Sequence, residues 1–174
     1  MKIANRVSRI VWVAVTVGSV SSVASGSLER TGYAGAACVR RSSSAATAAD
    51  YLISQGKVYN GSGSANLTLD CGAVRKHFSG TGITAGKAIV LDSSSIGNVL
   101  CEMRSDNPLT GSSMHQSRTT TGFASAPMTL TYTGLPADGA DNFYYWFCSI
   151  PPVEAGSGLK SAIYTLQIEN QFSG

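Results

Sequence analysis

Alternation of apolar and polar residues is the strongest pattern in this chain of 174 residues. It is clearest in 65–71, where Leu67, Leu69 and Cys71 alternate with Asn66, Thr68 and Asp70. Successive side chains of a strand point to opposite faces, so this segment is predicted as a strand with one buried face. The pattern recurs in 98–104, 128–133 and 161–169. The residues expected to face the core there are Val99, Cys101, Met103, Met128, Leu130, Tyr132, Ala162, Tyr164, Leu166 and Ile168.

The densest aromatic run lies in 143–150 and is followed by Pro151 and Pro152. Aromatic residues favour a pleated, half-buried surface, and proline cannot donate to a ladder, so we interpret this run as a central strand that ends at Ile150. Alternation predicts a core face of Tyr144, Trp146, Cys148 and Ile150. The opposite face carries Phe143, Tyr145 and Phe147.

The remaining segments complete the pattern. Residues 87–91 are predicted as an interior strand, and 55–59 as a strand that turns at Asn60-Gly61. The stretch 45–52 has helical propensity and is expected to form a single turn or part of a first strand. Two long loops are expected, 72–86 with His77 and 106–121 with His115; the second is read as a loop or as a loop plus a weak edge strand.

These segments predict an all-β fold with about seven strands, centred near residues 57, 68, 89, 101, 130, 147 and 165. Short strands with turn residues between them and no intervening amphipathic helices are typical of an antiparallel sandwich. A small β-barrel is the alternative. The length suits a single domain, which we expect to cover 38–174.

The N-terminal segment 1–25 is predicted to be a signal peptide. A basic region with Lys2, Arg6 and Arg9 precedes the apolar stretch 10–20, and small residues follow it, with cleavage expected after Ala24 or Ser25. The apolar stretch is shorter than the roughly 18 to 20 residues of a spanning helix, so we expect no membrane span after processing. Residues 26–37, mostly small and polar, are expected to be a flexible lead-in.

Removing 1–25 changes the charge of the chain. That segment holds three of the 13 Lys and Arg and none of the 10 Asp and Glu, so the remainder carries no formal net charge. Adjacent basic residues occur only at Arg40-Arg41 and Arg75-Lys76. A nucleic-acid partner is therefore not expected, because such a partner requires a clustered basic surface.

Four cysteines, Cys38, Cys71, Cys101 and Cys148, are expected to form two disulfides in an exported chain. Cys71 and Cys148 are predicted to face the core, so our preferred pairing joins them across the two sheets and leaves Cys38 to pair with Cys101. Three pairings are possible and spacing does not choose between them; the other pairing weighed joins Cys71 to Cys101 and Cys38 to Cys148. A metal site is not expected, since no two cysteines have zinc-ligand spacing and the chain has two histidines.

No set of residues in the sequence specifies a reaction. His77 and His115 lie in polar loops, no serine lies in a G-x-S-x-G motif, and the carboxylates are scattered. The segment 138–142 (DGADN) lacks the ligand spacing of a calcium loop and is read as a turn. Asn60-Gly61-Ser62 and Asn66-Leu67-Thr68 fit the N-glycosylation sequon. We expect no catalytic residues, no cofactor and no enzymatic activity.

Three of the four cysteines occur in short motifs, LDC at 69–71, VLC at 99–101 and YWFCSIPP at 145–152, and SAIY follows at 161–164. This pattern resembles that of small, uncharacterised exported bacterial β-sandwich proteins, a resemblance that implies no activity. The likeness to an immunoglobulin domain extends only to the sandwich, because Trp146 stands where that fold places a tyrosine two residues before its cysteine.

Two functions follow as hypotheses. The first is a noncatalytic structural or interaction protein, secreted or located in the periplasm or cell envelope, in which Phe143, Tyr145 and Phe147 are covered by a second layer or by self-association. The alternative is a carbohydrate-binding module, in which the same three rings form an exposed platform for a cell-surface polysaccharide.

Overall fold

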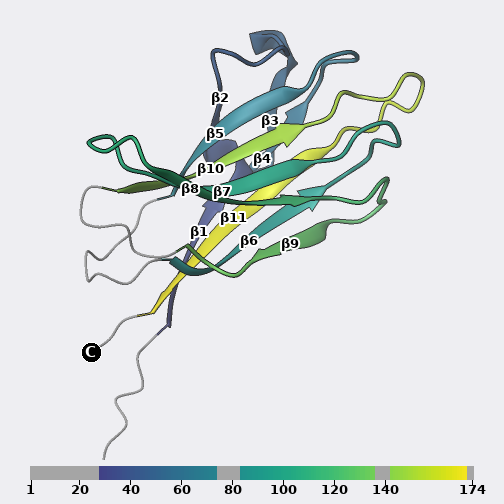
Figure 1. The fold of residues 1–174 in the computed structure, drawn as a ribbon. Coiled ribbons are helices and arrows are strands. Elements are labelled where there is room, and N and C mark those ends of the chain that lie inside the picture. Colours follow the sequence, from purple (N-terminus) through teal and green to yellow (C-terminus); the bar gives the residue numbers. More distant parts are fainter. Residues whose placement is uncertain (1–27, 74–82, 136–141, 172–174) are drawn as a thin grey trace, which may run out of the picture.

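The computed structural model describes residues 28–73, 83–135 and 142–171, which form two antiparallel sheets packed face to face (Figure 1). The first sheet has the order β3-β4-β11-β6-β9, with β1 also paired to β11. Its strands are β1 (Leu28–Ala34), β3 (Tyr51–Ser54), β4 (Lys57–Asn60), β6 (Ile83–Leu91), β9 (Met128–Tyr132) and β11 (Ala162–Gln171). The second sheet has the order β2-β5-β10-β7-β8. Its strands are β2 (Cys38–Arg40), β5 (Leu67–Ala73), β7 (Leu100–Asp106), β8 (Ser113–Thr119) and β10 (Phe143–Ile150).

The predicted antiparallel sandwich is confirmed, and the two sheets are separate rather than one closed sheet. The aromatic run forms β10 over the predicted residues 143–150 and is the central strand of its sheet. Antiparallel pairing with both β5 and β7 satisfies its backbone groups. The proline that follows Ile150 explains why the strand ends there.

Four of the eleven described strands, β1, β2, β3 and β8, were not among the seven predicted centres. Part of the expected lead-in is β1, which pairs with the C-terminal half of β11. The segment with helical propensity contains a short 3-10 turn, η2 (Ala48–Asp50), and then enters β3. In 106–121 the edge strand is present as β8, paired with β7 along its whole length. These strands are short or polar, so their sequences lack a one-sided apolar pattern.

The strand predicted over 55–59 begins later, at Lys57, and the chain leaves it after Asn60 as predicted. The backbone nitrogen of Ser62 donates to Oδ1 of Asn60 at 2.9 Å, but neither Asn60 nor Gly61 has a positive φ. The hairpin between β3 and β4 turns at Gln55-Gly56, where both residues have positive φ angles of 51° and 75°. Asn60 is instead fully buried at the end of β4. Its amide nitrogen donates to the carbonyl oxygens of Ala65, Ile150 and Pro151 at 2.8 to 3.0 Å. A buried side-chain amide therefore joins this end of the first sheet to the end of β10.

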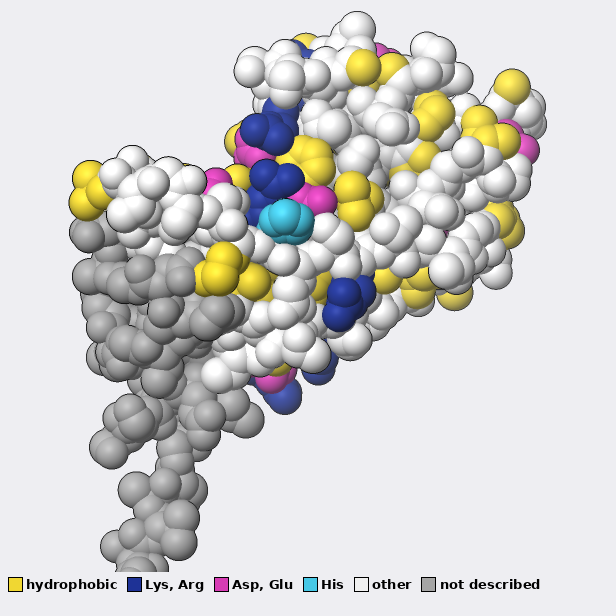
Figure 2. Space-filling view, viewed as in Figure 1, with side chains coloured by type: hydrophobic (Ala, Val, Ile, Leu, Met, Phe, Trp, Pro, Cys, Tyr) yellow, Lys and Arg dark blue, Asp and Glu magenta, His cyan; other side chains and the backbone are white. Residues whose placement is uncertain are grey.

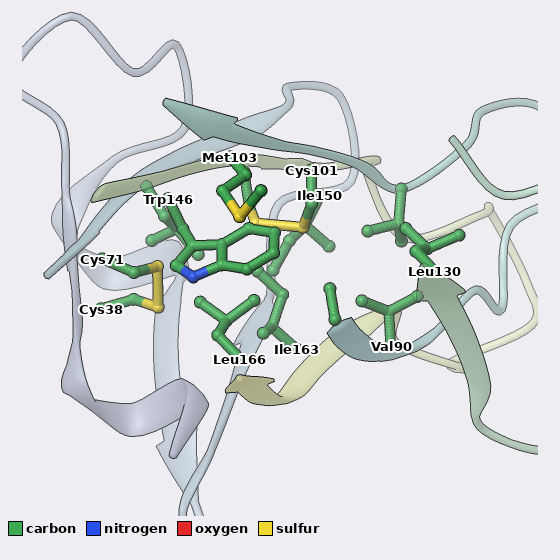
Figure 3. Close-up of a cluster of buried hydrophobic side chains, with 14 of the residues drawn as sticks. Cys38, Cys71, Val90, Cys101, Met103, Leu130, Trp146, Ile150, Ile163 and Leu166 are labelled. Atoms are coloured by element: carbon green, nitrogen blue, oxygen red, sulfur yellow. A yellow bond between two sulfur atoms is a disulfide. The ribbon is translucent and has the colours of Figure 1, made fainter. Parts of the chain in front are cut away.

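Trp146 lies at the centre of the core between the two sheets (Figure 3). Its ring meets Tyr132 edge to face, with ring centroids 4.8 Å apart. Opposite the ring, β6 carries Gly86, and a Cβ atom there would lie 2.8 Å from Sδ of Met103 and 3.1 Å from Cη2 of Trp146. The glycine thus provides the space that the indole occupies, because a packed core has few voids to absorb an added methyl group.

Both disulfides staple neighbouring strands of the second sheet, and both pairings considered from the sequence are wrong. Cys38 bonds to Cys71 and Cys101 bonds to Cys148, with Cα atoms 4.1 and 4.2 Å apart. Each pair lies directly opposite in its ladder, β2 with β5 and β7 with β10. Cys71 and Cys148 do face the core as predicted, but they belong to the same sheet. Since β5 and β10 are neighbours in one sheet, a Cys71–Cys148 bridge could not have joined the two sheets.

The predicted inward face of the last strand, Ala162, Tyr164, Leu166 and Ile168, is corrected at Tyr164. The register of β11 against β6 shifts between Ile163 and Thr165. An extra residue at a bulge reverses the alternation, so Ile163 is fully buried in the core with Leu166 and Ile168. Tyr164 is only partly buried, and the ammonium of Lys57 lies 4.3 Å from its ring centroid.

No helix in the described ranges is long and apolar enough to cross a bilayer. The predicted signal peptide, His77, the Arg75-Lys76 pair and the acidic residues Asp138 and Asp141 lie outside the described residues.

Candidate functional site

The outer face of the second sheet collects the aromatic residues of β10 and charged residues of its neighbours. Pairing in the ladder defines the rows across this face. Phe147 lies between Asp70 of β5 and Glu102 of β7, and Tyr145 lies between Gly72 and Arg104. Apolar, basic and acidic side chains gather together over the middle of this face (Figure 2). We call the set Val39, Arg41, Asp70, Gly72, Glu102, Arg104, Asp106, Phe143, Tyr145 and Phe147 the β10 face.

Phe147 is covered by two guanidinium groups from its own sheet. The Cζ atoms of Arg41 and Arg104 lie 5.2 and 4.9 Å from the centroid of the ring. Arg41 follows β2 and reaches across β5, whereas Arg104 belongs to β7 on the other flank of β10. Contacts of this kind between a cation and an aromatic face are favourable. The two guanidinium groups therefore cover part of the Phe147 ring within this chain.

Each guanidinium on the β10 face is held by a carboxylate. Arg41 Nε lies 3.1 Å from Oδ2 of Asp70, and Arg104 Nε donates to Oε2 of Glu102 at 2.8 Å. Ser117 donates to the other oxygen of Glu102 at 2.9 Å. Partial burial raises the pKa of the Glu102 carboxyl, but the hydrogen bonds from Arg104 and Ser117 outweigh it and bring the pKa below its usual range.

Phe143 and Tyr145 form the exposed aromatic part of the β10 face. Their rings are stacked, with centroids 5.5 Å apart and planes inclined by 23°. Phe143 is 50% exposed, and Tyr145 is half-buried. The Tyr145 hydroxyl donates to Oδ2 of Asp106 at 2.7 Å, which fixes the ring. Burial, and then the bond to Asp106, raise the pKa of Tyr145, so this hydroxyl stays protonated at neutral pH.

A shallow groove of about 350 Å³ runs beside the two stacked rings. It is lined by Val39, Arg41, Asp70, Cys71, Gly72, Phe143 and Tyr145. Gly72 forms part of its floor, and no heavy atom lies within 4 Å of the place where its Cβ would stand. The groove therefore combines an exposed ring, a half-buried ring, an exposed valine and one ion pair.

Of the three predicted site residues, the structure separates Phe147 from the other two. All three point away from the core, as the alternation predicted, but only Phe143 and Tyr145 line the groove. Arg41, Asp70 and Gly72 were missed as groove residues. In the sequence, Arg41 is about 30 residues from the other two, and all three are more than 70 residues from β10.

The other candidate residues do not line the groove, although His115 lies on the same outer face of the sheet (Figure 2). His115 is exposed on β8, directly opposite Arg104. Asn60 of the first glycosylation sequon is buried, and its amide donates to three carbonyl oxygens, so it is not accessible for glycosylation in the folded chain. Asn66 of the second sequon is exposed. Within the described ranges, no group of three or more His, Cys, Asp or Glu side chains is placed to hold a metal ion.

No family model and no curated protein sequence matches the chain. Among solved structures, the chain is similar to the low-affinity xylan-binding module CBM86 from Roseburia intestinalis, with a TM-score of 0.45 and 11% identity. That match covers 84% of this chain and 98% of the module. The chain is also similar to part of a family two carbohydrate esterase from Cellvibrio japonicus, with a TM-score of 0.36 and 12% identity. Here the match covers 84% of this chain and 35% of the esterase.

Proposed function

We propose that this protein is a noncatalytic carbohydrate-binding module that holds a polysaccharide on the β10 face. The observation that carries the proposal is the pair of stacked rings beside the groove, Phe143 exposed and Tyr145 half-buried. A sugar ring has an apolar face of CH groups and a rim of hydroxyls, so it suits a site with an aromatic surface and fixed polar groups.

The polar groups that border the rings are already held in place. Asp106 accepts hydrogen bonds from both Tyr145 and Ser113, the latter at 2.6 Å, and Asp70 is paired with Arg41. Groups held before binding lose little conformational freedom when the ligand arrives. The two disulfides beneath this face, Cys38–Cys71 and Cys101–Cys148, suit an extracellular or envelope protein.

Binding to soluble polysaccharides, measured by affinity electrophoresis and titration calorimetry with the purified chain, tests the proposal. Tyr145→Ala should weaken binding at least tenfold, since an aromatic residue at the centre of a binding site commonly carries a large share of the affinity. Tyr145→Phe should bind nearly as well, because it keeps the ring and loses only the hydroxyl, with its bonds to Asp106 and Arg104. Tyr164→Ala is the matched control, a partly buried tyrosine of the first sheet, and should bind like the original chain.

Two results would overturn this function. One is the absence of binding to any polysaccharide tested. The other is a dimer, seen by light scattering, that Phe143→Ala and Tyr145→Ala both dissociate, because the rings would then be a subunit interface. That second result would favour the structural or interaction role predicted from the sequence.

A further inference from the structure

Gly72 leaves a notch in the β10 face immediately beside Tyr145. The two residues lie directly opposite in the β5–β10 ladder, where side chains of neighbouring strands normally touch. Gly72 has no side chain to fill this place, and no heavy atom lies within 4 Å of its Cβ position. One side of the Tyr145 ring is therefore open to the groove rather than packed against a neighbour.

Asp70 stands at the end of this notch and offers a hydrogen-bond acceptor. It is two residues before Gly72 on β5, so both face outward, and its side chain is 39% exposed. Its Oδ1 atom is buried and has no partner within the described residues, so the exposed oxygen is Oδ2. Oδ2 faces Arg41 Nε at 3.1 Å, and a carboxylate oxygen accepts more than one hydrogen bond.

The charges around the notch favour an uncharged ligand. Arg41 is paired with Asp70 and Arg104 with Glu102, while Asp106 already accepts from Tyr145 and Ser113. A uronic acid would either displace a carboxylate from its arginine or lie close to Asp70 and Asp106 without a counterion. Like charges placed together in this way are unfavourable.

From these observations we infer that the Gly72 notch is the primary subsite for one neutral sugar residue. Its CH face rests on the Tyr145 ring, and one of its hydroxyls donates to Oδ2 of Asp70. This inference rests on the proposed carbohydrate-binding function and adds to it the position of the sugar, its acceptor and its lack of charge.

A pair of glycine variants tests the subsite. Gly72→Val fills the notch with a side chain that suits a strand, and should reduce binding of a neutral hexasaccharide at least tenfold. Gly63→Val is the matched control: Gly63 also has no heavy atom within 4 Å of its Cβ position, but it lies in the loop after β4. It should bind like the original chain. Thermal unfolding of both variants checks that each is folded.

The probes are cellohexaose, xylohexaose, mannohexaose and hexagalacturonate, titrated against the chain and its variants. We expect binding of at least one neutral probe, binding of hexagalacturonate at least tenfold weaker, and a loss of at least tenfold in Asp70→Ala. One outcome would contradict the subsite and leave the proposed function standing: a neutral probe binds the original chain and folded Gly72→Val, but does not bind Tyr145→Ala. Preference for hexagalacturonate would also overturn the inference. Binding of none of the four probes would overturn both.

Discussion

Gly86 and Trp146 face each other across the core, and a Cβ atom on Gly86 would lie 3.1 and 3.2 Å from two carbons of the indole ring. Gly86→Ala should therefore destabilise the protein by about 1 to 3 kcal/mol, the usual cost of overpacking a core. Urea unfolding measures the effect. Gly32→Ala on β1 is the control, since its nearest contact would be an ordinary 3.6 Å, and it should change stability little. Equal stability of the two variants would contradict the packing described for Trp146.

Peptide mapping of the non-reduced protein should recover Cys38 linked to Cys71 and Cys101 linked to Cys148. The bridges join residues 33 and 47 positions apart in the sequence. In the chain-entropy model, loops of this length correspond to about 4 kcal/mol of stability each. Replacing either pair by alanine should lower the free energy of unfolding by up to that amount. A peptide that links Cys71 to Cys148 would contradict both pairings.

Asn60→Asp should be strongly destabilising, although the two side chains have nearly the same shape. The Asn60 amide nitrogen donates to three carbonyl oxygens in a fully buried position. A carboxylate there would face three acceptors and donate to none, and leaving a buried polar group unsatisfied costs about 1 to 3 kcal/mol, more for a charge. Thermal unfolding at neutral pH measures the loss. Asn66→Asp, at an exposed position, is the control and should melt near the original temperature.

Acid should destabilise the protein partly through Glu102. Its pKa is lower in the folded chain than its usual value, so the folded state binds fewer protons than the unfolded state as the pH falls. The contribution of Glu102 is complete above the unfolded pKa, about 4.3, and is lost as the pH falls through the lower folded value. Glu102→Gln should therefore be less stable near pH 6 and should lose less stability between pH 6 and pH 3.

Chemical denaturation across that pH range checks the Glu102 prediction. Glu154→Gln serves as the control, because Glu154 lies outside the β10 face and hydrogen-bonds to Ser95. An unchanged pH dependence in Glu102→Gln would mean that the pair with Arg104 contributes nothing to acid sensitivity.

Much of the fold was predictable because burial follows a period of two along a strand. The bounds of β10, its central position and the inward face of Val99, Cys101 and Met103 were all read from the sequence and are confirmed. The prediction failed at Tyr164, where one extra residue reverses the alternation, and at β1, whose sequence lacks an apolar face; the edge strand β8 was one of two alternatives that its polar sequence left open. A bulge and the pairing of an edge strand depend on the partner strand, which the local sequence does not contain.

The sequence by itself determined that Phe143, Tyr145 and Phe147 share the side of β10 away from the core, because alternation within one strand is a local property. Only the tertiary structure decided which cysteines meet, since all four point inward and their pairing depends on strand order. The same order brings Arg41 and Arg104 over Phe147 and leaves Tyr145 beside Gly72. The groove exists because strands distant in sequence are neighbours in the sheet.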